Sequence, residues 1–145
     1  MGPEEEQTDN GHPAPELSEL KDLGTRQLRR GRLKKARATF EHVLKRDAKD
    51  VYALVKLGSV LAQQYEYDRA EWCLRRALGL DRNNLSALNN LGNVFLERGR
   101  LREAIECYQA AIRIDEHYVQ AYHNLAVAYK KDGDIANYLD VLRRS

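Results

Sequence analysis

Proline is nearly absent from this sequence, and its placement is informative. Of 145 residues only three are proline, and Pro3, Pro13 and Pro15 all lie among the first fifteen. Because proline removes a backbone donor and clashes with the preceding turn, nothing of that kind interrupts helix between Glu16 and Ser145. With 43% hydrophobic and 32% charged residues, the chain is predicted to form an all-α globular body.

Long apolar runs are also lacking. None approaches the roughly 20 residues that a membrane-spanning helix needs, and residues 1–6 are acidic, unlike the start of a signal peptide. We therefore expect no membrane association and a cytoplasmic location. The two cysteines, Cys73 and Cys107, stand apart with no CxxC pattern, which favours free, partly buried thiols over a disulfide.

Patterns of catalytic or metal-binding residues are lacking as well. The four histidines include no HExxH motif and no pair four residues apart on one helix face. Neither a GxSxG nor a GxxxxGK[ST] sequence occurs, and the acidic residues fall at ion-pairing spacings on polar helix faces. We expect no enzymatic activity, no cofactor and no metal.

What the sequence does contain is a period of 34 residues without insertions. A large residue followed by a small one marks the same point of each copy: Leu23-Gly24, Leu57-Gly58, Leu91-Gly92 and Leu125-Ala126. A second column is also small in three copies: Ala36, Ala70 and Ala104, with Tyr138 in the fourth. Apolar residues step by three and four within each half-copy, which predicts two amphipathic helices per copy. The small columns allow those two helices to approach closely.

This pattern resembles the tetratricopeptide repeat (TPR), which has large, Leu, Gly and aromatic residues on a first helix and Ala, aromatic, Ala on a second. The resemblance covers Leu17 to Ser145 and implies a right-handed superhelical solenoid of antiparallel helix pairs, in which stacked copies share a core. We place the domain at 16–145. Its four copies are residues 17–50, 51–84, 85–118 and a truncated 119–145.

About eight helices are expected from this register. Their ranges are 17–30, 33–46, 51–64, 67–80, 85–98, 101–114, 119–132 and 135–144. Asp50 and Asn84 stand at N-cap positions. Glycines at 31, 99 and 133 are predicted to end a helix in the left-handed conformation, and Tyr65 replaces the glycine of the second copy.

Charge is unevenly spread although the net charge is only +2. Residues 1–15 are predicted to form a disordered acidic tail. A basic cluster follows: Arg26, Arg29, Arg30, Arg32, Lys34, Lys35 and Arg37. Nucleic-acid binding is disfavoured, because no stacking aromatic is interleaved between these bases. The cluster is interpreted as a solvated edge of the first copy, or as a patch that the acidic tail covers transiently.

The resemblance implies that the first helix of each copy lines a concave groove. The positions expected to be exposed there lie one, four, five and eight places after the start of each copy. From this set we select the candidate contacts for a protein or peptide partner: Lys21, Tyr52, Lys56, Asn89, Asn90, Asn93, His123 and Asn124. In this interpretation Tyr52 is an apolar anchor.

Asparagines are concentrated in this set, with Asn90 and Asn124 in one column and Asn89 and Asn93 beside them. An amide both donates and accepts, so it can pair with a peptide bond of an extended ligand. Such a ladder is similar to those of O-linked N-acetylglucosamine transferase and kinesin light chains. The alternative is that asparagine is merely a tolerated polar residue on an exposed face.

The function indicated is therefore a protein-interaction scaffold or adaptor that binds extended partner segments in the groove. The carboxylate clamp that grips acidic chaperone tails is not matched, since only Lys21 fits its pattern. The alternative function is a self-assembling structural protein, a homo-oligomer that stacks through its uncapped fourth copy.

Overall fold

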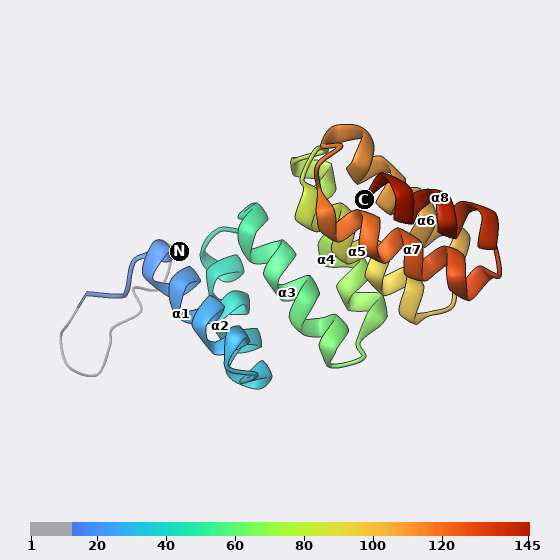
Figure 1. Cartoon of the computed structure of the whole chain (residues 1–145). Helices are drawn as coiled ribbons and strands as arrows, with labels where there is room; N and C mark the ends of the chain where they lie inside the picture. Colours follow the sequence, from blue (N-terminus) through green and yellow to red (C-terminus); the bar gives the residue numbers. More distant parts are fainter. Residues whose placement is uncertain (1–12) are drawn as a thin grey trace.

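The computed structural model describes residues 13–145, which form helices arranged as four antiparallel hairpins (Figure 1). The helices are α1 (Leu17–Arg29), α2 (Leu33–Arg46), α3 (Val51–Gln63), α4 (Tyr67–Leu80), α5 (Leu85–Glu97), α6 (Leu101–Ile114), α7 (Val119–Asp132) and α8 (Ile135–Arg144). The predicted all-α solenoid is confirmed, and every helix boundary agrees within one residue. The predicted acidic tail falls mostly outside the described residues, which begin at 13.

Helix ends form where the sequence predicts them. The side chains of Asp50 and Asn84 accept the backbone N–H groups of Ala53 and Ala87, at 2.9 Å in each case. These two bonds satisfy donors that would otherwise be left open in the first turns of α3 and α5. The glycines at positions 31, 99 and 133 adopt positive φ values, as expected of left-handed helix ends.

The pattern of helix contacts explains the curvature of the stack. Each helix packs against the next one along the chain, and the odd-numbered helices also contact each other, as α1 with α3, α3 with α5, and α5 with α7. Within residues 13–145 the even-numbered helices make no comparable contacts with one another. The odd-numbered helices are therefore closer together and form the concave wall, as the resemblance implied.

Within a hairpin, the closest approach occurs at the small column of the first helix. Three hairpins pair a glycine with a large side chain of the second helix: Gly24 with Phe40, Gly58 with Leu74, and Gly92 with Tyr108. A Cβ atom on Gly92 would lie 2.5 Å from Cε1 of Tyr108, which is too close for two carbon atoms. The fourth hairpin has Ala126 in this column, and its counterpart Leu142 is 48% exposed, so the contact there is looser.

The two cysteines are free thiols, as predicted. Cys73 is buried and Cys107 is half-buried, and burial raises the pKa of both, that of Cys107 to about 11. They belong to the packing layer of the second helices. No helix among residues 13–145 is long and apolar enough to cross a bilayer.

The glycine column yields a test with a matched control. We expect Gly92→Ala to lower the free energy of unfolding by about 1–3 kcal/mol, because the added methyl group overpacks the contact with Tyr108. Gly79 lies in α4, and a Cβ atom added there would meet no other atom within 4 Å. There, Gly79→Ala should instead raise stability by about 0.4–1 kcal/mol through reduced freedom of the unfolded chain. Urea unfolding measures both, and equal effects would contradict the close-approach argument.

Candidate functional site

The concave wall contains a furrow between α3 and α5, with two adjoining pockets. The tyrosine pocket, of about 480 Å³, is lined by Leu33, Ser59, Ala62, Gln63, Tyr65, Tyr67, Asn90, Asn93 and Glu97. The lysine pocket, of about 320 Å³, is lined by Tyr52, Val55, Lys56, Ser59, Asn84, Ser86, Asn90, Tyr118 and Gln120. Ser59 and Asn90 belong to both pockets, so the two form one continuous hollow along the furrow.

The lysine pocket is organised around Tyr52. Its hydroxyl group forms a 2.6 Å hydrogen bond with the hydroxyl of Thr25 on α1, and its ring lies 5.4 Å from the Lys56 ammonium, a cation–π contact. Tyr52 remains 43% exposed. Within residues 13–145 Lys56 makes no ion pair, so its charge is available to a ligand.

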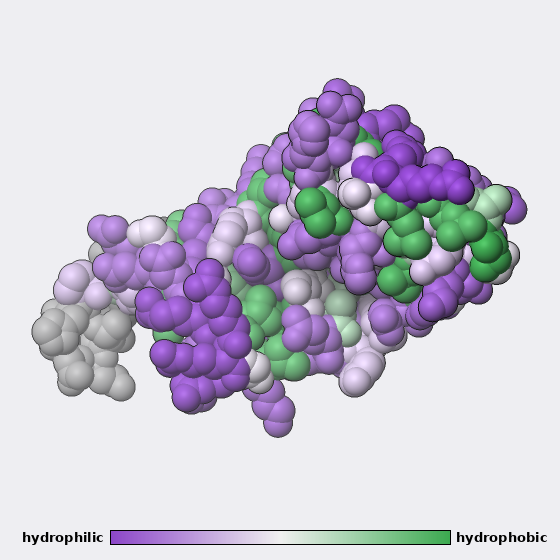
Figure 2. Space-filling model, in the orientation of Figure 1, coloured by the Kyte–Doolittle hydropathy of each residue, from purple (hydrophilic) through white to green (hydrophobic). Residues whose placement is uncertain are grey.

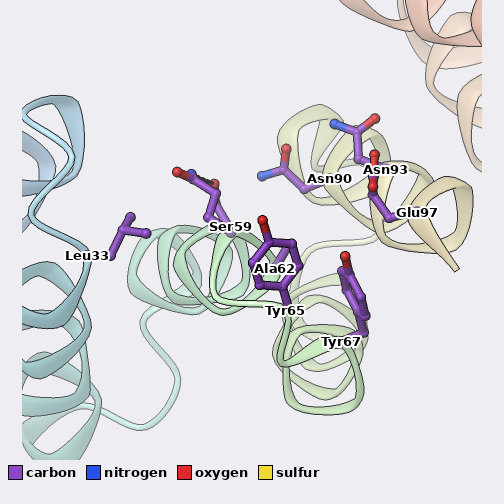
Figure 3. Close-up of a pocket in the computed structure, with 9 residues that line it drawn as sticks. Leu33, Ser59, Ala62, Tyr65, Tyr67, Asn90, Asn93 and Glu97 are labelled. Carbon is purple, nitrogen blue, oxygen red and sulfur yellow. Dashed lines mark hydrogen bonds between the residues drawn. The ribbon is translucent and has the colours of Figure 1, made fainter.

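The tyrosine pocket has an aromatic side and a polar side. Tyr65 and Tyr67 meet edge to face, with ring centroids 6.3 Å apart, and in Figure 3 their hydroxyl groups point to the same side as the Glu97 carboxylate. Asn93 accepts a 2.5 Å hydrogen bond from the buried Tyr108, which fixes its amide. The exposed Glu97 makes no ion pair with any described residue.

Tyr65 has an unusual backbone conformation. Its φ of 63° is the only positive value among the non-glycine residues described. A left-handed conformation costs an ordinary residue roughly 1–2 kcal/mol, and the Tyr65 side chain, 78% exposed, recovers little of this by burial. Tyr65, which replaces the glycine of the other copies, is thus a source of local backbone strain at the rim of a pocket. Backbone strain of this kind often occurs at functional sites.

Asn89 was expected to be exposed in the groove, and this expectation is wrong. Asn89 is only 6% exposed, and its amide oxygen accepts a 2.9 Å hydrogen bond from the amide of Asn124. The bond joins α5 to α7 beneath the surface. Val55, one repeat earlier, is buried as well. Val55 and Asn89 lie between neighbouring odd-numbered helices, so they support the groove wall rather than facing a ligand.

The other predicted contacts divide into two groups. Tyr52, Lys56, Asn90 and Asn93 line the two pockets. Lys21, His123 and Asn124 are not among the lining residues. Lys21 forms a 2.9 Å ion pair with Asp50, the N-cap of α3, so its charge is already balanced. His123 is exposed on α7.

Sequence reasoning missed Tyr65, Tyr67 and Glu97. A signal for Glu97 was present, because positions 86, 90 and 93 follow a helical stripe whose next member is 97. The expected groove positions of this copy end at Asn93, one helical turn before Glu97. For Tyr65 the signal is its departure from the glycine of the other copies, which by itself does not place the residue in the groove.

The basic cluster lies at the α1–α2 turn, beside Leu33, which lines the tyrosine pocket. Its six members before Arg37 are exposed or half-exposed at this end of the solenoid. Arg37 forms ion pairs of 3.0 Å with Glu41 and 3.1 Å with Glu66, and these hydrogen-bonded contacts raise the Arg37 pKa and lower the Glu66 pKa. Among the described residues no group of histidine, cysteine and acidic side chains is arranged to hold a metal.

These features define a helical-repeat protein with a polar, tyrosine-edged furrow on its concave face. Family models agree on the type of repeat. The model described as "Tetratricopeptide repeat" matches residues 21–84, and a second, described as "TPR repeat", matches residues 92–133. The chain belongs to the tetratricopeptide repeat family. No curated protein sequence matches it significantly.

Solved structures show the same architecture. MamA superimposes with a TM-score of 0.79 at 25% identity, covering 88% of this chain and 70% of MamA. An O-GlcNAc transferase mutant of Thermobaculum terrenum gives 0.76 at 27% identity, over 78% of this chain but only 22% of that protein. The first TPR domain of Spaghetti (RPAP3), bound to the HSP90 peptide SRMEEVD, gives 0.75 at 17% identity, covering 81% of this chain and 93% of that domain.

The strain at Tyr65 can be measured directly. We expect Tyr65→Gly to raise the free energy of unfolding by up to about 1 kcal/mol, because relief of the left-handed strain exceeds the added freedom of glycine in the unfolded chain. The matched change is Gly99→Ala, at a position with φ of +74° and open space. It should lower stability by about 1 kcal/mol. Destabilisation by Tyr65→Gly would show that the ring contributes more to folding than its exposure suggests.

Proposed function

We propose that the protein is a non-catalytic interaction scaffold that binds extended segments of partner proteins in the furrow between α3 and α5. One observation carries this proposal: Asn90 lines both pockets, and its side-chain amide has no hydrogen-bond partner within residues 13–145. A free amide in the centre of a furrow can donate to and accept from one peptide unit of an extended chain.

The surroundings of Asn90 support the same function. Hydroxyl, amide and aromatic groups line two connected pockets of about 480 and 320 Å³, and the tyrosine rings of both pockets offer apolar contact area. The RPAP3 domain, solved with a bound HSP90 peptide, has the same fold, which supports a peptide as the type of ligand. Affinity for a short peptide should lie at roughly 1–100 μM, because ordering a flexible ligand offsets much of the contact energy.

The proposal is tested by selecting short random peptides on the immobilised protein by display, and measuring the affinity of selected peptides by fluorescence anisotropy. Asn90→Ala should weaken binding by about 3- to 10-fold, the value of one or two lost hydrogen bonds. The control is Asn83→Ala, which changes an exposed asparagine in the α4–α5 connection. Asn124→Ala is unsuitable, because it leaves the buried Asn89 oxygen without its donor.

Two results would contradict groove binding. One is the recovery of no peptide above background. The other is a set of selected peptides that bind wild type, Asn90→Ala and Asn83→Ala equally well. Circular dichroism of each variant establishes that the helices are intact, since neither asparagine side chain belongs to the hydrophobic core.

A second candidate function, self-association, is favoured by the surface of α8. Ile135, Leu139 and Leu142 are 56%, 45% and 48% exposed and follow one helical stripe, while Val141 is the buried residue of this helix. Apolar side chains gather at this end of the molecule in Figure 2, whereas the α1–α2 hairpin is mostly hydrophilic. An apolar stripe of this kind can be covered by a helix of another copy.

Self-association predicts a mass that rises with protein concentration in light scattering or sedimentation. Leu139→Glu should then restore the monomer, because a charge in the apolar stripe opposes its burial. Leu80→Glu provides the control, since Leu80 is 42% exposed on α4 and lies outside the stripe. A monomeric mass at all concentrations would eliminate this second function and leave the first untouched.

A further inference from the structure

We infer that the furrow selects segments of mixed charge, placing an acidic side chain in the lysine pocket and a basic side chain in the tyrosine pocket. This deepens the proposed function and rests on it. The inference comes from the distribution of charge along the furrow, from the strained tyrosine at its rim, and from the separation of the two pockets.

Each pocket is lined by one charged side chain, and the two have opposite signs. Lys56 is the charged residue among those lining the lysine pocket, and Glu97 is the one lining the tyrosine pocket. Elsewhere on the solenoid, charges are commonly balanced across hairpins, as in the pairs of Lys21 with Asp50 and Arg37 with Glu66. Lys56 and Glu97 have no such partner among residues 13–145. The furrow therefore has a positive end and a negative end that remain open to a ligand.

The tyrosine pocket has the chemistry of a cation site. A carboxylate attracts an ammonium or guanidinium group, and the faces of nearby aromatic rings add cation–π attraction. Tyr65 and Tyr67 stand at an interplanar angle of 83°, so two differently oriented rings border the space near Glu97 (Figure 3). Asn90 and Asn93 supply amide groups to the same pocket. The charge of an arginine or lysine side chain would be balanced by the carboxylate, and its aliphatic stem would contact the tyrosine rings.

The conformation of Tyr65 supports a role in this pocket. Glycine occupies the equivalent turn position in the other three repeats, with φ between 71° and 78°. Tyr65 adopts the same turn despite its side chain, and its ring meets that of Tyr67 edge to face while remaining 78% exposed. The fold does not require a large residue here, since glycine makes the same turn. Contact with a ligand would explain why a tyrosine occupies this position, whereas packing within the fold does not.

The separation of the pockets sets the spacing of the two ligand charges. Lys56 on α3 and Asn90 on α5 are equivalent positions of successive repeats, and Glu97 lies seven residues beyond Asn90 on the same face of α5. Seven residues of helix advance by about 10 Å, and the distance between neighbouring helix axes adds about 9 Å at right angles to this advance. The two charged positions are therefore about 13–14 Å apart, a distance that an extended chain covers in about four residues. The preferred ligand thus has an acidic and a basic residue about four positions apart, with an intervening peptide unit at Asn90.

The test uses four synthetic peptides with the same flexible Gly/Ser/Thr framework. They carry aspartate and arginine, two aspartates, two arginines, or two serines at positions four apart. Fluorescence anisotropy at low salt should show that wild-type protein binds the mixed peptide about 3- to 10-fold more tightly than the other three. The preference should shrink as salt screens the charges.

Charge-reversed variants make the assignment specific. Glu97→Lys should shift the preference to the peptide with two aspartates, and Lys56→Glu to the one with two arginines. The double variant should regain the mixed peptide, bound in the opposite direction. Controls are Glu106→Lys on α6 and Lys45→Glu on α2, which reverse exposed charges outside the furrow and should leave the order unchanged. Glu97→Gln and Lys56→Gln replace any reversed variant that does not fold by circular dichroism.

The outcomes separate this inference from the function on which it rests. If wild type shows no preference for the mixed peptide, or the controls change the order as much as the furrow variants, the mixed-charge inference is overturned. Peptide binding that remains sensitive to Asn90→Ala would still support the groove. If selected peptides bind without dependence on Asn90, groove binding fails and the inference fails with it. A shift of preference confined to the furrow variants confirms the inference.

Discussion

The contact between a glycine on one helix and a large side chain on the next determines the geometry of this solenoid. Gly58 and Gly92 leave no room for a Cβ atom, because Leu74 and Tyr108 fill that space completely. The two helices of a hairpin approach most closely at this contact, and the large side chain is buried between them. A bulkier residue would separate the axes and alter the angle of the hairpin. Repetition of this contact every 34 residues keeps successive hairpins in the same arrangement.

The furrow is a product of that arrangement. Among the helices of residues 13–145, only the odd-numbered ones contact their counterparts in adjacent hairpins. The side chains on the facing sides of these helices are therefore either buried between two helices or exposed along the furrow. Asn89 bonds to Asn124 and supports the wall, whereas Asn90, one residue along, faces the hollow. Tyr108 connects the two functions: its ring is the buried anchor opposite Gly92, and its hydroxyl orients Asn93 in the tyrosine pocket.

The fold could be predicted from sequence because its determinants are local and repeated. The N-caps at Asp50 and Asn84 and the 34-residue register locate every described helix within one residue. The groove was harder to predict, because exposure depends on contacts between helices 34 residues apart. The buried Asn89 could have been recognised from Val55 in the same column, an apolar residue that is unusual on an open face. The Lys21–Asp50 pair could not, since side-chain pairing between hairpins depends on the angle at which they stack.

Within residues 13–145 each hairpin contacts only adjacent hairpins, and this has a consequence for stability. A solenoid whose units touch only their neighbours behaves as a one-dimensional array, in which stability is the sum of unit and interface terms. Among the described helices α8 contacts only α7, and it has one buried side chain, Val141. Loss of its packing on α7 would remove few contacts and need not propagate to the other hairpins. The α3–α5 furrow, which has an interface on each side, can therefore keep its shape if α8 loses that packing.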